Sequence, residues 1–188
     1  MKIRLASDKI QRDSIVDGEG IRSVIWTQGC LHNCPGCHNP ETHSFLSGYE
    51  IEIEDLLKKI DSLEAQDGIT FSGGDPMAQP EACSLIAAYC KERGLNIWCY
   101  TGYTFEKLLE MSNDNSYIMN FLKNIDVLVD GRFILSEKSL NLKFKGSKNQ
   151  RIIDVPKSLK ENKVCLVEKY AKEKSYEKLA SKDHYMYI

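Results

Sequence analysis

The sequence lacks any long apolar run. No segment of its 188 residues approaches the ~18 consecutive apolar residues that a membrane-crossing helix needs. The first ten residues alternate charged and short apolar stretches, and they lack the apolar centre of a signal peptide. We therefore expect a cytoplasmic protein that does not span a membrane.

An excess of charge of one sign is also missing. Lys and Arg number 25 against 27 Asp and Glu, which leaves a net charge of −2. No overall field draws the chain to nucleic acid or to a membrane surface, so neither is expected as a partner. Repeats and low-complexity segments are absent as well. The length suits one domain, which we predict to span residues 1–168, followed by a tail or helix over 169–188.

Cysteine, by contrast, is frequent and unevenly placed. Three of the seven cysteines fall within residues 30–37, and the others are scattered through apolar segments where they are expected to pack. A disulfide scaffold would be smaller, richer in loops and evenly paired. A tight cysteine group in a reduced compartment indicates a metal site or catalysis instead.

The order of predicted elements indicates an α/β fold. Apolar runs predict strands at 22–27, 69–71, 95–100 and 125–129, with later strands at 152–155 and 164–167. Between them, helical spacing predicts helices near 53–63, 80–93, 104–109 and 117–122. Alternating strands and helices are typical of a parallel sheet. A full eight-fold barrel takes ~250 residues, so we expect a partial, open β/α barrel.

Unusual residues follow four of the predicted strands. These loops, 28–37, 72–76, 101–102 and 130–131, are rich in Gly, Cys, Asp or Thr. Because parallel sheets place their chemistry at the carboxyl ends of the strands, the four loops are expected on one rim.

The cysteine loop is the strongest signal. Cys30, Cys34 and Cys37 are spaced Cys-x3-Cys-x2-Cys, with Gly36 in the short intervening turn. Iron–sulfur clusters normally take four thiolates, so three would leave one iron open. The amino and carboxylate groups of S-adenosylmethionine (SAM) would fit that iron. The alternative is a zinc site of three cysteines with His32, His38 or His43, which lacks the usual second ligand pair.

The second loop places two glycines where a ligand could approach the backbone. Ser72, Gly73 and Gly74 end the strand, and no side chain would stand in the way at the glycines. Asp75 would then either hold the ammonium group of a ligand or shape the turn. The sequence does not decide between these two roles.

Other candidates are weaker. Asp130 either faces the rim, which we favour, or only ends its strand. For Thr101, a role at the rim and a role in the turn alone are equally supported. His32 and His38 are expected to be solvated, although His38 could stack near a cofactor. The basic stretch at 143–151 could hold phosphate or an acidic partner, or form a solvated turn.

Several runs together resemble a known family. Asp-Gly-Glu-Gly-Ile-Arg at 17–22, Thr-Gln-Gly-Cys at 27–30 and residues 34–40 resemble the radical-SAM activating enzymes of glycyl-radical proteins, and residues 72–76 match their SAM loop. Residues 126–133 and 145–155 are similar to the subgroup that acts on anaerobic ribonucleoside-triphosphate reductase. His38, Asn39 and Pro40 instead resemble the activators of pyruvate formate-lyase.

The resemblance implies a [4Fe–4S] cluster with SAM on its open iron, in a radical-SAM partial barrel. Reductive cleavage of SAM would yield methionine and a 5′-deoxyadenosyl radical, which would take a hydrogen atom from a glycine of the reductase. A flavodoxin or ferredoxin would supply the electron. The catalytic and metal-ligating residues would be Cys30, Cys34 and Cys37; the cofactor-binding residues would be these three with Gly36, His38, Ser72, Gly73, Gly74, Asp75, Thr101 and Asp130.

Three other functions stay open at this point. The chain could activate another glycyl-radical enzyme, such as pyruvate formate-lyase. It could be a radical-SAM enzyme for a small molecule, for example a pterin. It could also be a non-catalytic electron-transfer or zinc module, which would leave SAM untouched.

Overall fold

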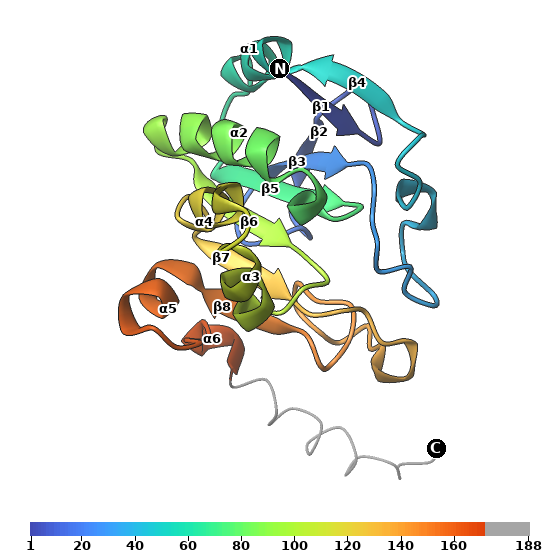
Figure 1. The fold of residues 1–188 in the computed structure, drawn as a ribbon, viewed down its shortest axis with the longest axis vertical. Coiled ribbons are helices and arrows are strands. Elements are labelled where there is room, and N and C mark those ends of the chain that lie inside the picture. Colours follow the sequence, from blue (N-terminus) through green and yellow to red (C-terminus); the bar gives the residue numbers. More distant parts are fainter. Residues whose placement is uncertain (172–188) are drawn as a thin grey trace, which may run out of the picture.

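A computed structural model describes residues 1–171, and residues 172–188 lie outside the described part. The chain is a mixed α/β protein built on one open eight-stranded sheet (Figure 1). The strands are β1 (Lys2–Leu5), β2 (Gln11–Ser14), β3 (Arg22–Thr27), β4 (Tyr49–Glu52), β5 (Gly68–Gly73), β6 (Asn96–Tyr100), β7 (Val127–Asp130) and β8 (Arg151–Asp154). They lie in the order β4-β1-β3-β5-β6-β7-β8, and β2 pairs with β3.

Helices connect the strands, and α1 to α4 cover one side of the sheet. They are α1 (Ile53–Asp61), α2 (Pro80–Glu92), α3 (Phe105–Met111), α4 (Ser116–Leu122), α5 (Val155–Glu161) and α6 (Glu168–Ala171), with short 3-10 turns at Pro40–Thr42, Pro76–Ala78 and Leu135–Glu137. Figure 1 shows α1, α2, α4 and α3 in a row along that side. Within residues 1–171, no helix has both the length and the apolar character that crossing a membrane requires.

The two faces of the sheet differ, as the alternation of side chains along a strand requires. On β6, Ile97 and Cys99 belong to the main apolar core beneath the helices. Trp98 points to the opposite face and packs with Val129 of β7 and Ile152 of β8, and Tyr100 packs against this second group. The same alternation decides which side chains can reach a site on the open face.

The predicted parallel strands are confirmed. β3, β5, β6 and β7 pair in parallel with one another. The four carboxyl ends therefore lie at one edge of the sheet, where Figure 1 places the loops 28–48 and 131–150. The helices near 53–63, 80–93, 104–109 and 117–122 are also present.

Other expectations about the sheet were wrong. β8 runs antiparallel to β7, because its connection returns at the same edge without a crossover helix. Residues 164–167 form no strand and contribute one isolated bridge, between Ile153 and Leu166. The strands β1 and β4 were missed because charged residues dominate them; their pairing includes an ion pair of Arg4 Nη2 with Glu50 Oε1 at 2.6 Å.

A buried arginine fastens the amino ends of three parallel strands together. Arg22, only 1% exposed, donates to Thr70 Oγ1 at 2.7 Å and to the carbonyl oxygens of Ile69 and Asn96 at 2.8 Å. Burial lowers the pKa of Arg22 to about 10, so the side chain still carries its charge at neutral pH. β3, β5 and β6 are therefore held in register at the end opposite the candidate site.

Helix α6 extends across the predicted domain boundary at residue 168. Its Tyr170 is buried and contacts the rings of Trp98 and Phe144 edge-on, with centroids 6.2 and 5.6 Å apart. The beginning of the predicted tail therefore packs on the sheet. Most of that tail, 172–188, lies outside the described residues, and the division at 168 stays a prediction.

Candidate functional site

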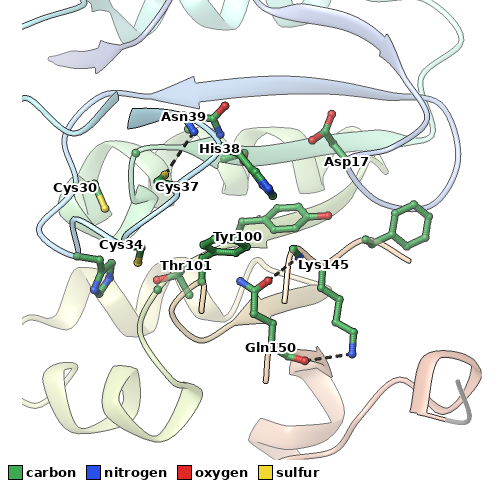
Figure 2. Close-up of a pocket in the computed structure, with 18 of the residues that line it drawn as sticks. Asp17, Cys30, Cys34, Cys37, His38, Asn39, Tyr100, Thr101, Lys145 and Gln150 are labelled. Carbon is green, nitrogen blue, oxygen red and sulfur yellow. Dashed lines mark hydrogen bonds between the residues drawn. The ribbon is translucent and has the colours of Figure 1, made fainter. Parts of the chain in front are cut away.

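A cavity of about 610 Å³ opens at the carboxyl ends of the parallel strands (Figure 2). Its floor follows from the sheet register. Trp26 lies opposite Ser72 in the β3–β5 pair, and Tyr100 is the corresponding inward residue at the end of β6. All three line the cavity. A volume in the ~300–1,000 Å³ range is typical of small-ligand sites.

The three cysteines of the loop after β3 all line this cavity. Cys30, Cys34 and Cys37 are free and partly buried, and we call them the cluster-loop cysteines. The backbone N–H of Asn39 donates to Cys37 Sγ at 3.4 Å, as Figure 2 shows. Burial raises the pKa of the Cys30 thiol. Soft sulfur donors facing one cavity suit iron, whose positive charge would favour the thiolate form.

Backbone contacts hold the cysteine loop against the sheet. The N–H groups of Gly29 and Cys30 donate to the carbonyl oxygens of Thr42 and His43, at 2.8 and 3.1 Å. Gly36 has a φ of +72°, and a Cβ there would lie 2.8 Å from Leu135 Cδ1. Gly36 therefore allows the turn between two cysteines, and it is not among the residues that line the cavity.

Gly73, which ends β5, and Gly74 line the cavity with Ser72, and both are tightly packed against the backbone of the protein. A Cβ on Gly74 would lie 2.4 Å from the carbonyl oxygen of Gly29, and one on Gly73 would lie 2.5 Å from that of Thr27. The close approach is thus between this loop and the cysteine loop. The glycines let the two loops share one wall of the cavity.

Asp75 faces protein groups rather than the cavity. It is 1% exposed, and its carboxylate accepts from the backbone N–H of Met77 at 2.9 Å, from Thr101 Oγ1 at 3.0 Å and from the N–H of Gly102 at 3.0 Å. His32 Nε2 lies 2.7 Å away and donates to it. Of the two roles that the sequence left open, this geometry favours the shaping of the turn.

Asp130 ends β7 and Thr101 follows the neighbouring strand β6, but their side chains lie in different places. Thr101 lines the cavity while its hydroxyl donates to Asp75. Asp130 is buried on the helix side of the sheet, where it accepts from the N–H of Phe105 at 2.8 Å and from Arg151 Nε at 2.9 Å. The structure therefore does not place the Asp130 side chain at the rim, where we expected it. The alternation along β7 turns this side chain away from the cavity and toward the helices.

The histidines of the cysteine loop are not all solvated. The His32 side chain is held by Asp75 and lies edge-on to Tyr103, with ring centroids 4.4 Å apart, contrary to the expected exposure. His38 reaches into the cavity (Figure 2) and packs against Phe133 at 5.0 Å. Across residues 1–171, no three His, Cys, Asp or Glu side chains are gathered closely enough to hold one metal ion.

The basic stretch at 143–151 divides into two parts. Lys143 and Lys145 line the cavity. Arg151 instead lies between two carboxylates, bonding to Asp130 and to Glu106, whose Oε2 is 2.7 Å from Arg151 Nη2. The hydrogen bond from Arg151 lowers the pKa of Glu106 to about 2. The second part is thus a structural clamp between β8, β7 and α3.

Some cavity residues were not predicted from the sequence. Asp17, Tyr100, Phe133 and Gln150 all line the cavity. Gln150 shapes its wall by accepting from the N–H of Gly146 at 2.8 Å. The sequence position of Tyr100 could have indicated a site residue, since it stands at the end of a predicted strand next to Thr101. In the sequence, however, it has the same pattern as an ordinary core tyrosine.

Comparison with known proteins identifies the family. Residues 16–153 match the family of 4Fe-4S single cluster domains, which decides between the iron–sulfur and zinc interpretations in favour of iron–sulfur. The chain is 35% identical over 148 residues to the anaerobic ribonucleoside-triphosphate reductase-activating protein of Vibrio cholerae, covering 73% of this chain and 90% of that protein. The Escherichia coli protein of the same name is 35% identical over 144 residues, or 72% and 90%.

A related activating enzyme also matches over a shorter part of its length. The pyruvate formate-lyase-activating enzyme of Clostridium pasteurianum is 36% identical over 123 residues, which cover 62% of this chain and 52% of that enzyme. The reductase-activating proteins are matched along nine-tenths of their length. With its three free cysteines on one cavity at the carboxyl edge of the sheet, the chain belongs to the family of anaerobic ribonucleoside-triphosphate reductase-activating proteins.

Proposed function

We propose that this chain generates a glycyl radical on anaerobic ribonucleoside-triphosphate reductase, using a [4Fe–4S] cluster and SAM. The observation that carries the proposal is that all three cluster-loop cysteines line one cavity together with Ser72, Gly73 and Gly74. The bound cluster and SAM would supply the radical chemistry, and the protein would supply binding, orientation and exclusion of water.

Each group of site residues has a proposed task. The cluster-loop cysteines would hold three irons, and the N–H of Asn39 on Cys37 Sγ would stabilise the negative charge of that thiolate. The backbone of the glycine loop would line the place of SAM. Asp75 and Thr101 would contact neither the cluster nor SAM, and would hold in place the loops that carry the ligand-binding residues. Asp130 would act only through Arg151 and the end of β7.

The shape of the sheet supports the finer proposal of a radical-SAM partial barrel. Four parallel strands carry the candidate site at their carboxyl ends, and the antiparallel β8 ends that series. A partner glycine must reach the cavity, and the sheet leaves that edge open. A flavodoxin or ferredoxin as electron donor and a cytoplasmic location, with no nucleic acid or membrane involved, stay predictions.

The first test is spectroscopic. The anaerobically reconstituted protein is reduced, and its EPR spectrum is recorded with and without SAM. A [4Fe–4S]⁺ signal that changes on adding SAM is expected, since SAM binds the open iron. A protein without iron, or a cluster indifferent to SAM, would refute the proposal.

The second test identifies the partner. The reduced protein is mixed with SAM and either anaerobic ribonucleoside-triphosphate reductase or pyruvate formate-lyase, and the glycyl radical is measured by EPR. The radical is expected on the reductase. A radical formed only on pyruvate formate-lyase would transfer the function to the second family that matches the chain.

A further inference from the structure

The ring of Tyr100 stands in the middle of the cavity. β6 ends at Tyr100, and the alternation along that strand turns Cys99 to the helices and Tyr100 to the open face. Figure 2 shows the ring projecting between Cys30 and Cys34 on one side and Asp17 on the other. A ligand that extends from the cysteines along the cavity must therefore pass over this ring.

Most other aromatic residues of the cavity wall already pack against a ring. His38 contacts Phe133 at 5.0 Å, and Phe144 contacts Trp98 at 5.3 Å and Tyr170 at 5.6 Å. Tyr100 has no ring partner among the described residues.

Trp26 and His43 are the other cavity rings without an aromatic neighbour in the described part of the chain. The ring of His43 is held by Asn33, whose Oδ1 lies 3.1 Å from His43 Nδ1. The remaining comparison is with Trp26. Its indole N–H donates to Gln11 Oε1 at 2.8 Å, and Gln11 lies on β2 at the side of the sheet. Tyr100 lies on β6 and Trp26 on β3, so the two residues flank the central strand β5. Because the indole of Trp26 is held by Gln11 and no such bond holds Tyr100 within residues 1–171, the ring of Tyr100 is the freer of the two to meet a ligand.

The chemistry of the hydroxyl group fits an uncharged binding surface. Burial raises the pKa of Tyr100 above its ordinary value, and the negative charge of Asp17 adds to the effect. The side chain is therefore a neutral phenol at physiological pH. In residues 1–171 its hydroxyl makes no hydrogen bond, so no polar contact of the hydroxyl accounts for the position of the ring.

We propose that Tyr100 is the platform on which the adenine ring of SAM stacks. This inference rests on the proposed function, in which the amino and carboxylate groups of SAM lie at the cluster. The remainder of SAM is a nucleoside, which then extends away from the cysteines toward Tyr100. Flat bases stack on aromatic side chains in many sites, with a contribution that corresponds to roughly tenfold or more in affinity.

The test measures binding rather than turnover. The anaerobically reconstituted protein is titrated with SAM and, separately, with methionine, which offers the same amino and carboxylate groups without the nucleoside. In Tyr100→Leu, SAM is expected to bind about tenfold more weakly than in the wild type, because the stacking is lost. Methionine is expected to bind equally to both proteins, which also shows that the cluster is intact.

Conservative variants separate the ring from its hydroxyl. Tyr100→Phe and Tyr100→Trp keep an aromatic face, so both are expected to bind SAM within about twofold of the wild type. Should Tyr100→Leu fail to take up iron, Tyr100→Met provides the same comparison with a flexible apolar chain. Trp26→Leu tests the alternative platform on β3. Tyr49→Leu, at an exposed position on the edge strand β4, is the matched control and is expected to retain SAM affinity.

Four results would overturn the inference. Unchanged SAM affinity in Tyr100→Leu would show that Tyr100 does not contact SAM. If glycyl-radical formation were also lost at that unchanged affinity, the ring would contact the partner protein instead. Equal losses in Tyr100→Phe and Tyr100→Leu would assign the contact to the hydroxyl. A loss in Trp26→Leu alone would move the platform to β3. A wild-type protein that binds no SAM would refute the proposed function itself, so the two failures are distinguishable.

Discussion

Replacing Asp75 by alanine tests whether this carboxylate joins the loops of the site or meets a ligand. In the structure it is buried and serves three loops at once: its own turn through Met77, the loop after β6 through Thr101 and Gly102, and the cysteine loop through His32. Alanine removes the acceptor of all four donors. We expect Asp75→Ala to lower the stability of the protein strongly.

The size of the loss follows from the number of buried donors. Each buried donor left without a partner costs about 1–3 kcal/mol, and water entering from the cavity relieves part of that cost. Four donors at that cost, reduced by the entering water, leave an expected total of about 3–5 kcal/mol. For a chain of this length each kcal/mol lowers Tm by about 2–4 °C. The expected decrease in Tm is therefore about 6–20 °C.

Thermal unfolding of the reconstituted protein without SAM, followed by circular dichroism, measures this decrease. Asp75→Asn keeps one oxygen acceptor and the shape of the side chain, so a smaller decrease is expected. Asp114→Asn, at an exposed position after α3, is the matched control and should leave Tm unchanged. A Tm for Asp75→Ala within about 2 °C of the wild type, together with weaker SAM binding, would refute the reasoning. Asp75 would then be a residue that contacts the ligand.

Three further predictions concern the cysteines, the glycine loop and acid stability. Alanine at any one of the cluster-loop cysteines should abolish the [4Fe–4S]⁺ EPR signal and lower the iron content, because two thiolates hold a cluster poorly; full iron content in one variant would remove that cysteine from the ligand set. Gly74→Ala should disrupt the cysteine loop, since its Cβ would lie 2.4 Å from the carbonyl oxygen of Gly29; a reconstituted variant with normal iron content and Tm would contradict this. Glu106→Gln should destabilise the iron-free protein by at most about 1 kcal/mol at pH 7 in urea unfolding, because the carboxylate is largely exposed. Since the folded pKa of Glu106 is lowered from 4.5 to about 2, the contribution is present above pH 4.5 and disappears as the pH falls toward 2; a difference that grows on acidification would be the wrong sign.

The parallel part of the fold could be predicted because apolar residues dominate it. β3 and β6 are almost fully buried, and buried parallel strands appear in the sequence as continuous apolar runs. The short strands β1, β2 and β4 contain charged and exposed residues, so their patterns resemble loops. The direction of β8 was out of reach as well, because an apolar run does not tell which way a strand crosses the sheet.

The candidate site was predictable where residue type alone carries the chemistry. The cysteines and the glycine loop do line one cavity. Side-chain direction was the part that could not be predicted: Asp75 and Asp130 both follow strands, yet both turn toward buried donors of the protein. A carboxylate after a strand has the same appearance in a sequence whether it faces a ligand or a backbone N–H.

The reversed direction of β8 has a consequence for how proteins of this architecture can diverge. Because β7 and β8 are antiparallel, the chain between them, residues 131–150, stays at the cavity edge and needs no helix to carry it back across the sheet. That connection supplies Phe133, Lys143, Lys145 and Gln150 to the cavity wall. Insertions and deletions there leave the order of the strands intact. We therefore expect evolutionary change in the shape of the entrance to accumulate in this connection, while the neighbouring cysteine loop stays constant.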